Sequence, residues 1–477
     1  MSSEKASIQE VDLADARQPH LARAAGSNWI KTWLVALGCL AALVAVHEFQ
    51  LRRQGFRPGI VDDQELWCVH RDRVYGGEKT FVLVGASRVQ LGFSSDVFSK
   101  WFPDYRFVQL AVDGSRGLAA FLDLANDPKF KGTVLYSARA PVLIPRGNDV
   151  QQEYVNYYHQ QWNSSQRVER QFSAWLQERF ALIHPSHRLE GYFRSIVLDQ
   201  SAAADNTSYV RTLGDRTRQA DYRSIDVLKL RASRLSRVVN ARRNRPPLNQ
   251  KEWLSKLTDL RVASEKIQQR GGQAVFVRFP TTEQHWRLDE RMAPRARFWD
   301  ELAGVAGAPT IHFRDLPTRY LDCPDTSHFD QRDAPVFTAA LVRELMRQGL
   351  LPERPQPESL KIPDRQFWSR EWRLENGGRL VGQFLGEKSE QVAIMVEVPR
   401  EALSWADNSY VDSTKTPASK FRRWSLGQRT ITGSLLASDK NRVRLGMQIK
   451  KSQLGPDDVA YVDSTFSGAS GGSLPEK

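Results

Sequence analysis

The sequence predicts an α/β fold, a three-layer parallel sheet covered by helices, over about residues 79–351. Short runs rich in β-branched and aromatic residues alternate there with long stretches of helical spacing, an order typical of parallel sheets. A hydrophobic fraction of 41% supplies packed cores, and a chain of 477 residues exceeds one compact core. The expected strands are Thr80–Val84, Phe107–Ala111, Thr133–Tyr136, Ala274–Arg278 and Thr310–Phe313.

An apolar segment near the start predicts one membrane-spanning helix at residues 29–49, after an N-terminal tail at 1–28. Its length matches the roughly 20 residues that a helix needs to cross a bilayer core. Lys31 and Glu48 stand where they can reach the two interfaces, and no small-x-small pattern closes the segment, which favours an uncleaved anchor. Because Thr32–Val46 is apolar on every face, a half-exposed soluble helix is disfavoured.

The formal net charge of +13 favours anionic neighbours such as lipid head groups or acidic glycans. Basic residues are dense at 231–237 and 242–245 without a nucleic-acid-binding motif beside them, so we expect no nucleic-acid partner. No phosphate loop or dinucleotide fingerprint occurs, and we expect no cofactor. Three cysteines exclude a disulfide-rich framework; of these, Cys68 and Cys323 either pair in an exported domain or stay free and buried, while Cys39 lies in the apolar segment.

Between about residues 147 and 270 the chain is far longer than an ordinary crossover and has helical spacing, which predicts a helical insertion. Two roles stay open for it: a cap over an active site, or an embellishment that faces solvent. Within it, His184 and His187 are too close for a helical zinc pair, and no carboxylate or cysteine completes a site, so we expect no metal.

The end of the chain predicts two small antiparallel barrels at 364–413 and 420–464, after a Pro-rich linker at 352–363 and before a tail at 465–477. The repeat is carried by Trp372, Gly382, Val392, Leu403, Asp407, Tyr410, Val411, Asp412 and Ser413, which recur as Trp424, Gly433, Val443, Leu454, Asp458, Tyr461, Val462, Asp463 and Ser464. These copies resemble SHD-type modules, small SH3-like barrels. The resemblance implies binding or structural packing rather than catalysis.

Three polar residues predict nucleophilic chemistry. Ser87 follows the expected strand Thr80–Val84, at the strand end where open α/β sheets place reactive groups, although a helix cap also suits this position. Asp325 and His328 lie three residues apart, just before the expected helix Arg332–Met346. A serine hydroxyl needs an imidazole to take its proton, and the imidazole needs a carboxylate to orient it. The pattern therefore favours a catalytic triad.

Three ordered blocks, at Gly85–Gln90, Val112–Ser115 and Asp325–His328, make the chain similar to the SGNH (GDSL-like) hydrolase superfamily. The nearest likeness is to the extracytoplasmic SGNH-like domains of polysaccharide O-acetylation proteins. This resemblance implies a flavodoxin-like sheet, with Ser87 as nucleophile, His328 as general base and Asp325 as its orienting partner. It also implies an oxyanion hole formed by the backbone N–H groups of Ser87 and Gly114.

The chain departs from the family at its third block, which supplies an asparagine side chain to the oxyanion hole. Here Tyr136–Ala140 holds no asparagine, and losing one such donor typically costs about a hundred- to a thousandfold in rate. Ser137 and Arg139 are the candidates to replace it. Arg88 and Arg139 are also possible substrate contacts. His312, on an expected strand, is interpreted as a hydrogen-bonded core residue.

The resemblance implies a serine esterase or O-acetyltransferase that acts on an extracytoplasmic glycan, with its catalytic domain in the periplasm or otherwise outside the inner membrane. A transferase would need a separate membrane protein to deliver the acyl donor. Arginines lie on both sides of the apolar segment, in the tail and in the juxtamembrane segment 50–78, so charge does not set the orientation. The alternative is a non-catalytic scaffold whose barrels bind a protein or envelope partner; the missing asparagine favours it, whereas the retained triad opposes it.

Overall fold

The computed structural model of the chain describes residues 29–53, 56–145, 149–183, 209–319, 321–362, 369–375, 377–414, 421–426 and 429–467. It divides into two compact units, residues 1–57 and 58–477. The tail at 1–28, the pair His184 and His187, and the last ten residues lie outside the described residues.

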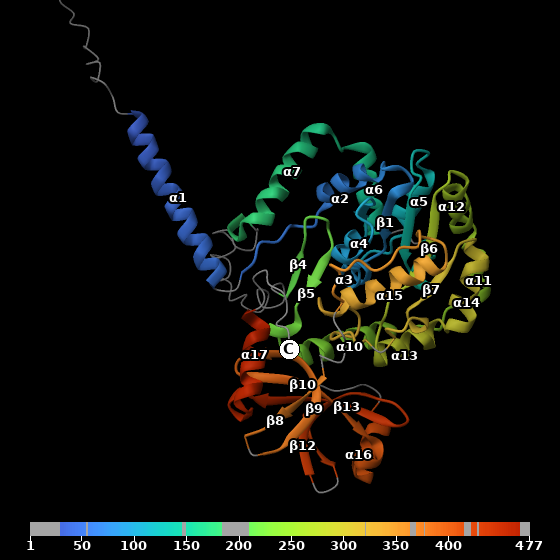
Figure 1. Cartoon of the computed structure of the whole chain (residues 1–477). Helices are drawn as coiled ribbons and strands as arrows, with labels where there is room; N and C mark the ends of the chain where they lie inside the picture. The colour runs from blue at the N-terminus through green and yellow to red at the C-terminus, as the bar shows by residue number, and fades with distance from the viewer. Residues whose placement is uncertain are drawn as a thin grey trace, which may run out of the picture. The chain divides into compact units, whose positions relative to one another are not determined.

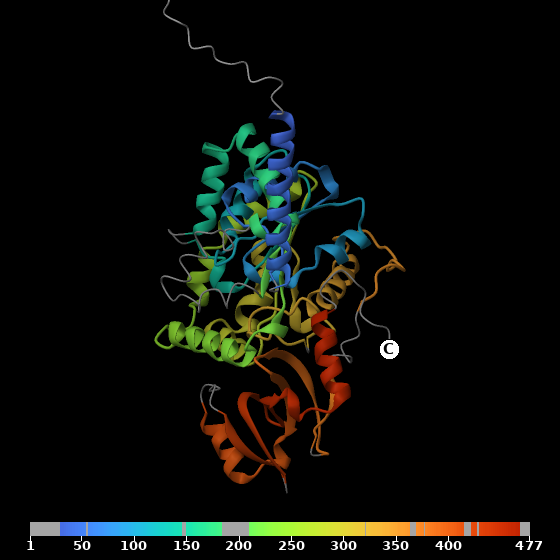
Figure 2. The ribbon, with the colours of Figure 1, turned by 90° about the vertical axis from the view of Figure 1, so that its left-hand side faces the viewer.

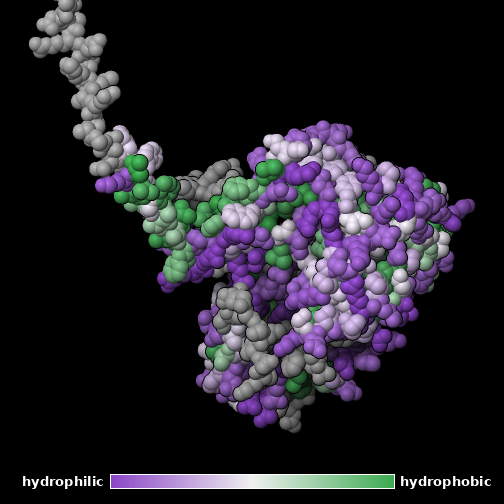
Figure 3. Space-filling model, turned by 45° about the horizontal axis from the view of Figure 1, so that its top comes forward, coloured by the Kyte–Doolittle hydropathy of each residue, from purple (hydrophilic) through white to green (hydrophobic). Residues whose placement is uncertain are grey.

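The first unit contains the helix α1, Trp29–Arg53. At 1.5 Å per residue its 25 residues extend about 37 Å, against about 30 Å for a bilayer core. The apolar side chains are exposed along this helix, as the space-filling view shows (Figure 3). One helix long and apolar enough to span a membrane is thus present near the N-terminus of the described chain.

The second unit begins with the parallel sheet that the sequence predicts (Figure 1). Its five strands are β1 (Thr80–Val84), β2 (Arg106–Gln109), β3 (Thr133–Ser137), β6 (Gln273–Arg278) and β7 (Thr310–His312). They lie in the order β2-β1-β3-β6-β7, and every pair is parallel. The chain therefore crosses over to opposite sides of β1, which places a topological switch point between β1 and β3.

Alternate side chains of each strand enter two separate cores, which confirms the predicted three layers. On β1, Val82 and Val84 face one core, while Phe81 and Leu83 face the other. The first core is covered by helices α2 (Gln64–Arg71), α5 (Leu118–Asn126), α12 (Thr258–Gln269) and α14 (Arg295–Ala306). The second is covered by helices α3 (Ser87–Gly92), α4 (Ser95–Trp101) and α15 (Asp333–Arg347).

The predicted insertion is helical in large part, but not throughout. Its helices are α6 (Val150–Gln160), α7 (Ser164–Arg179), α10 (Val227–Arg242) and α11 (Gln250–Ser255), and helix α13 (Glu283–Met292) follows β6. The prediction of a helical insertion did not include a hairpin of two three-residue antiparallel strands, β4 (Val210–Thr212) and β5 (Arg218–Ala220). Strands this short carry no readable alternation of apolar and polar residues.

Short 3-10 helices complete the described second unit. They are Asp72–Val74, Gly77–Lys79, Ala140–Val142, Ala181–Ile183, Tyr222–Ser224, Phe313–Asp315, Arg400–Ala402 and Lys451–Gln453.

The C-terminal repeats form one antiparallel sheet, and the prediction of two separate barrels was wrong in this respect. Its strands are β8 (Ser369–Arg373), β9 (Arg379–Lys388), β10 (Gln391–Pro399), β11 (Arg422–Leu426), β12 (Arg429–Ser438) and β13 (Arg442–Lys450), in the order β11-β12-β13-β10-β9-β8. Strand β10 of the first repeat pairs with β13 of the second along their whole length. Trp372 and Trp424, from the two copies, consequently lie in one core.

Each repeat packs its helix against the first strand of the other copy (Figure 2 shows both helices beside the sheet). On α17 (Pro456–Ser467), the Asp458 carboxylate accepts the backbone N–H of Arg373 at 2.6 Å. On α16 (Trp405–Ser413), Asp407 accepts the backbone N–H of Ser425 at 2.8 Å in the same way. A fifty-residue module buries too little surface to be stable alone, and the matching sequences let two copies exchange helices.

Candidate active site

The structure brings the three predicted triad residues together at the carboxyl edge of the parallel sheet. The Ser87 Oγ lies 2.9 Å from His328 Nε2. The Asp325 Oδ2 lies 2.8 Å from His328 Nδ1. With Nδ1–H donating to the carboxylate, Nε2 is left as an acceptor for the serine proton.

Asp325 is held on both of its oxygens. Its Oδ1 accepts the backbone N–H groups of Ser327 at 2.9 Å and of His328 at 2.8 Å. Its Oδ2 also forms an ion pair with Arg234 Nε of α10 at 3.0 Å. Burial raises the pKa of Asp325, but His328, Arg234 and the amide hydrogen bonds outweigh burial and hold it well below its usual value. The carboxylate therefore stays charged in a site that excludes water from it.

The loop that carries Asp325 and His328 is backbone-strained at Thr326, whose φ is +74°. A β-branched residue rarely adopts this conformation. Two bonds fix the turn: the Thr326 N–H donates to the Cys323 carbonyl at 2.7 Å, and the Thr282 N–H donates to the Thr326 carbonyl at 3.1 Å. The turn fixed by these two hydrogen bonds lies between Asp325 and His328, whose side chains are in contact.

Two glycines allow the chain to turn sharply between β1 and Ser87. Gly85 has a φ of +143°, and a Cβ there would lie 2.9 Å from the Ser137 carbonyl oxygen. Gly117, with a φ of +86°, approaches so closely that its Cβ would lie 2.7 Å from the Gly85 Cα. No larger residue fits at either position, so the backbone pair fixes where Ser87 leaves the strand.

The predicted oxyanion-hole residues lie on the two loops that follow β1 and β2. Gly114 has a φ of +72°, and the space beside its Cα is open. No side chain caps α3, whose first residue is Ser87. Among the described residues, neither the Ser87 N–H nor the Gly114 N–H has a hydrogen-bond acceptor. Both donors are thus free to receive a ligand oxygen.

Asp113, inside the second block but given no role by sequence, faces the nucleophile. Burial raises the pKa of Asp113, but Arg218 of β5, whose Nη1 lies 2.7 Å from Oδ2, outweighs it. His328 and the Ser87 hydroxyl also lower this pKa, so its net value lies below the usual one. The hairpin therefore delivers a cation to a carboxylate beside Ser87.

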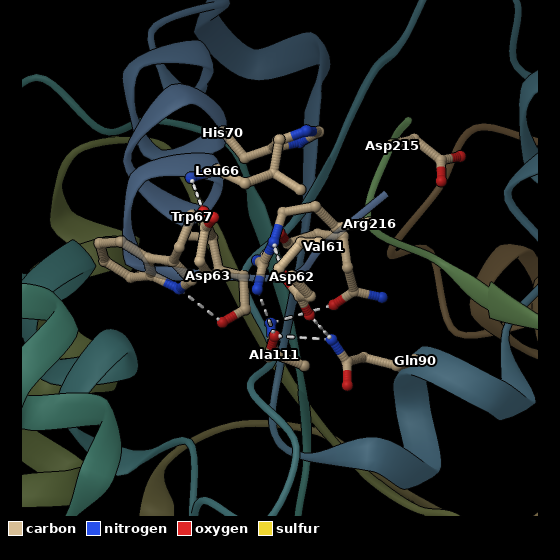
Figure 4. A network of polar contacts seen from close by, with 12 residues as sticks. Val61, Asp62, Asp63, Leu66, Trp67, His70, Gln90, Ala111, Asp215 and Arg216 are labelled. Atoms are coloured by element: carbon tan, nitrogen blue, oxygen red, sulfur yellow. Dashed lines mark hydrogen bonds and ion pairs between the residues drawn. The ribbon is translucent and has the colours of Figure 1, made fainter. Parts of the chain in front are cut away.

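A buried arginine clamps this hairpin to the sheet (Figure 4). Arg216 Nε donates to Asp62 at 2.7 Å, Nη1 to the Gln109 carbonyl at 2.6 Å and Nη2 to the Ala111 carbonyl at 3.1 Å. Gln90 donates to the same Asp62 carboxylate at 2.9 Å and to the Ala111 carbonyl at 3.1 Å. The clamp joins the hairpin, α3 and the end of β2 into one unit.

We expect Arg216→Ala to lower the free energy of unfolding by about 3–5 kcal/mol, because it removes the buried cation from the half-buried Asp62 carboxylate and leaves Gln90 as the remaining side-chain donor to Asp62 and to the Ala111 carbonyl. The measurement is the thermal unfolding midpoint, with limited proteolysis to report whether β4 and β5 become the first cleavage site. Arg243→Ala, at an exposed position, is the control. Equal midpoints for the two variants would contradict the clamp.

Helix α10 contributes a second buried arginine that the sequence did not single out. Arg231 Nη1 donates to Asp322 at 2.9 Å and to the carbonyls of Cys323 and Pro324, each at 3.0 Å. Its Nη2 donates to Glu283 at 2.6 Å. The insertion thus holds the residues that lead directly into the triad loop, and its predicted role as an embellishment facing solvent does not fit α10.

The two predicted substrate contacts lie near one another on the carboxyl edge, half-buried. Arg88 Nε donates to Ser327 Oγ at 3.3 Å, and its Nη2 lies 3.4 Å from His285 Nε2. The guanidinium of Arg139 makes no hydrogen bond or ion pair with any described residue. No hydrogen bond among the described residues joins Ser137 or Arg139 to the triad.

The remaining predicted residues make no hydrogen bond to the triad side chains among the described residues, although Cys323 lies two positions before Asp325. His312 is a core residue, as expected: its Nδ1 accepts the Arg314 N–H at 3.1 Å, and burial lowers its pKa to about 2. Cys68 and Cys323 are free and buried in the two different cores. A hollow of about 680 Å³ lies at the amino ends of the strands, opposite the triad.

Comparisons with family models, with curated proteins and with solved structures found no match to this chain. The geometry of the site and the sequence blocks are therefore the basis for assigning a function.

Proposed function

We propose that this protein is a serine acyl-ester hydrolase or O-acyltransferase of the SGNH type, acting through Ser87, His328 and Asp325. The observation that carries the proposal is the unbroken chain of contacts from Ser87 Oγ through both ring nitrogens of His328 to Asp325. Support also comes from its place, since the serine follows the first strand and the Asp-His loop precedes the last helix of the sheet domain.

In the first half-reaction, His328 Nε2 takes the hydroxyl proton as Ser87 Oγ attacks the ester carbonyl carbon. The carbonyl oxygen becomes an oxyanion, which the free N–H groups of Ser87 and Gly114 stabilise. The C–O bond to the leaving alcohol then breaks, and the imidazolium returns its proton to that alcohol. Asp325 stays ionised and stabilises the imidazolium throughout.

In the second half-reaction, His328 deprotonates water or a sugar hydroxyl, whose oxygen attacks the carbonyl carbon of the acyl-serine. The bond from that carbon to Ser87 Oγ then breaks, and the imidazolium returns its proton to Ser87 Oγ. Water gives hydrolysis and a sugar gives transfer, and both use the same residues. Asp113 would oppose the oxyanion with its negative charge, but Arg218 neutralises it from the hairpin. The hairpin is therefore part of the electrostatic design of the site.

The proposed setting is an extracytoplasmic glycan at the inner membrane, with α1 as anchor and a separate membrane protein as acyl donor if transfer is the reaction. The apolar helix and the basic charge support it. The second candidate is a non-catalytic scaffold. It is favoured by one observation, that the segment Tyr136–Ala140 holds no asparagine for the oxyanion hole.

The test is covalent labelling of the full-length protein in detergent with a fluorophosphonate, combined with p-nitrophenyl acetate turnover. We expect the label on the peptide that contains Ser87, and we expect both signals to vanish in Ser87→Ala but not in Ser413→Ala, an exposed position. If the folded native protein is neither labelled nor able to hydrolyse the ester, the enzyme proposal is contradicted and the non-catalytic scaffold is favoured.

A further inference from the structure

The carboxyl edge between β3, β6 and α13 carries more positive charge than the fold uses. Arg88, Arg139, Arg242 and Arg278 lie there around the carboxylate of Asp289. Arg278 Nη2 lies 2.6 Å from Asp289 Oδ2, and Arg242 Nη1 lies 2.7 Å from Oδ1. Both Asp289 oxygens are therefore engaged, and Glu290, which lines the neighbouring cavity, accepts the backbone N–H of Arg295, so the four arginines still outnumber these two carboxylates.

Arg88 and Arg139 are the two cations without an acidic partner among the described residues. Arg88 meets only neutral groups, Ser327 Oγ and the His285 ring. Arg139 meets none, and it lines a cavity of about 30 Å³ with Arg278 and Asp289. That volume exceeds the roughly 10–15 Å³ that one water needs. The guanidinium thus borders space into which a ligand oxygen fits.

The neighbouring histidine does not add to or relieve this charge. Burial and the surrounding arginines lower the pKa of His285 to about 3, so the ring is neutral at pH 7. Burial and neighbouring cations also lower the pKa of Arg88 and of Arg139 to about 10, and both stay charged at neutral pH. The excess charge is therefore present under working conditions.

A half-buried cation with no ion-pair partner is costly, and a ligand can supply the missing charge. Planar guanidinium groups match the two oxygens of a carboxylate or phosphate. Arg88 is adjacent to the nucleophile in sequence and binds Ser327, which lies beside His328 on the triad loop. An anion held by Arg88 would consequently sit next to the ester that Ser87 attacks.

We propose that Arg88 and Arg139 bind an anionic group of the substrate, the carboxylate of an acidic sugar or a sugar phosphate, close to the reacting ester. The position of the ester rests on the proposed function. The binding of the anion does not, because it needs only the two arginines. This subsite would select acidic over neutral glycans without any change to the triad.

The experiment is calorimetric titration of full-length Ser87→Ala protein in detergent with D-glucuronate, glucose 6-phosphate and D-glucose. We expect one or both anions to bind and D-glucose not to bind; the tighter anion identifies the group. Adding Arg139→Gln or Arg88→Gln should weaken anion binding at least tenfold. Arg261→Gln, at an exposed position of α12 where Arg261 pairs with Glu265, should leave anion binding unchanged. No binding of either anion, or equal binding by Arg139→Gln, would overturn the proposal.

Thermal unfolding separates a ligand-binding role from a structural one. Removing a half-buried charge that has no ion-pair partner should leave the midpoint of Arg139→Gln equal to or above that of the parent, whereas a structural arginine would lower it. The failures are also distinguishable. If the protein binds an anion but the native form does not hydrolyse ester, the subsite proposal stands and the esterase proposal fails. If the native form hydrolyses ester but the protein binds neither anion, the esterase proposal stands and the subsite proposal fails.

Discussion

Asp325→Asn is expected to lower kcat for p-nitrophenyl acetate about ten-thousandfold while the fold remains intact. The carboxylate receives Nδ1–H of His328 on Oδ2 and two backbone N–H groups on Oδ1. An asparagine keeps one oxygen, and the backbone amides hold that oxygen where Oδ1 now lies. Its NH₂ group then points at His328 and must donate.

A donating amide forces Nδ1 of His328 to act as acceptor, so the proton moves to Nε2. The nitrogen that should take the Ser87 proton then carries one of its own, and the hydroxyl loses its base. The variant also removes the charge that stabilises the imidazolium. Substrate binding does not involve this carboxylate, so KM should change far less than kcat.

The measurement is steady-state kinetics together with the rate of fluorophosphonate labelling, with far-ultraviolet circular dichroism to confirm folding. Asp315→Asn, a surface carboxylate paired with Arg295, is the matched control and should retain native kinetics. Turnover by Asp325→Asn within tenfold of the native value would show that the contact seen here is structural and not catalytic.

The parallel sheet and the triad could be predicted because each has a local signal. Five apolar runs mark the five strands, and the observed bounds differ from the expected ones by at most two residues. The triad depends on a Gly-Ser after the first strand and a D-x-x-H before the last helix. Both segments end at the same sheet edge by topology, so sequence order was enough to bring them together.

The residues that support the triad could not be predicted, because their partners are distant in sequence. Arg231 and Arg234 stand in a run of arginines that reads as a solvated basic face. Their i, i+3 spacing puts them on one side of α10, but their partners begin at Glu283. A charge run looks the same whether it faces solvent or a buried acid. Arg216 could not be predicted for the same reason, because its partners Asp62, Gln109 and Ala111 are also distant in sequence.

The repeats show a different limit. Trp372, Asp407 and their counterparts in the second copy correctly marked two equivalent modules. Because the two copies have equivalent surfaces, however, the helix of one copy can pack on the first strand of either copy. The sequence therefore does not determine whether Asp407 binds the first strand of the first repeat or that of the second. The structure pairs it with Ser425 of the other copy, and the shared sheet follows from that exchange.

The C-terminal sheet also reaches the active-site framework through one ion pair. Arg444 of β13 lies 3.5 Å from Glu283, whose φ is +53° and whose other oxygen binds Arg231. The sheet docks closely here, since a Cβ on Gly386 would lie 2.4 Å from the Tyr222 carbonyl. Arg231 is therefore the junction between the insertion, the triad loop and the repeats.

Arg231→Leu is consequently expected to lower the free energy of unfolding by about 3–5 kcal/mol and to release the triad loop. The leucine leaves Glu283 and Asp322 buried without the cation that both bind. In the native protein, burial raises the pKa of Glu283, and Arg231 offsets only part of that rise. Burial also acts to raise the pKa of Asp322, but Arg231 outweighs it and holds that pKa below its usual value. Without the arginine both folded-state pKa values lie above the unfolded ones.

The sign of the pH dependence follows from those shifts. A carboxyl group whose pKa is raised in the folded state binds a proton more tightly there than in the unfolded chain. The stability that this group contributes is therefore present at low pH and is lost as the pH rises. The loss relative to native protein should therefore be larger at pH 8 than at pH 5, measured as the thermal midpoint by tryptophan fluorescence. Arg237→Leu, exposed on the same helix, should show neither effect. An Arg231→Leu deficit that is equal at both pH values would mean that the two acids are not sealed from solvent by the arginine, and the junction would then be a surface contact.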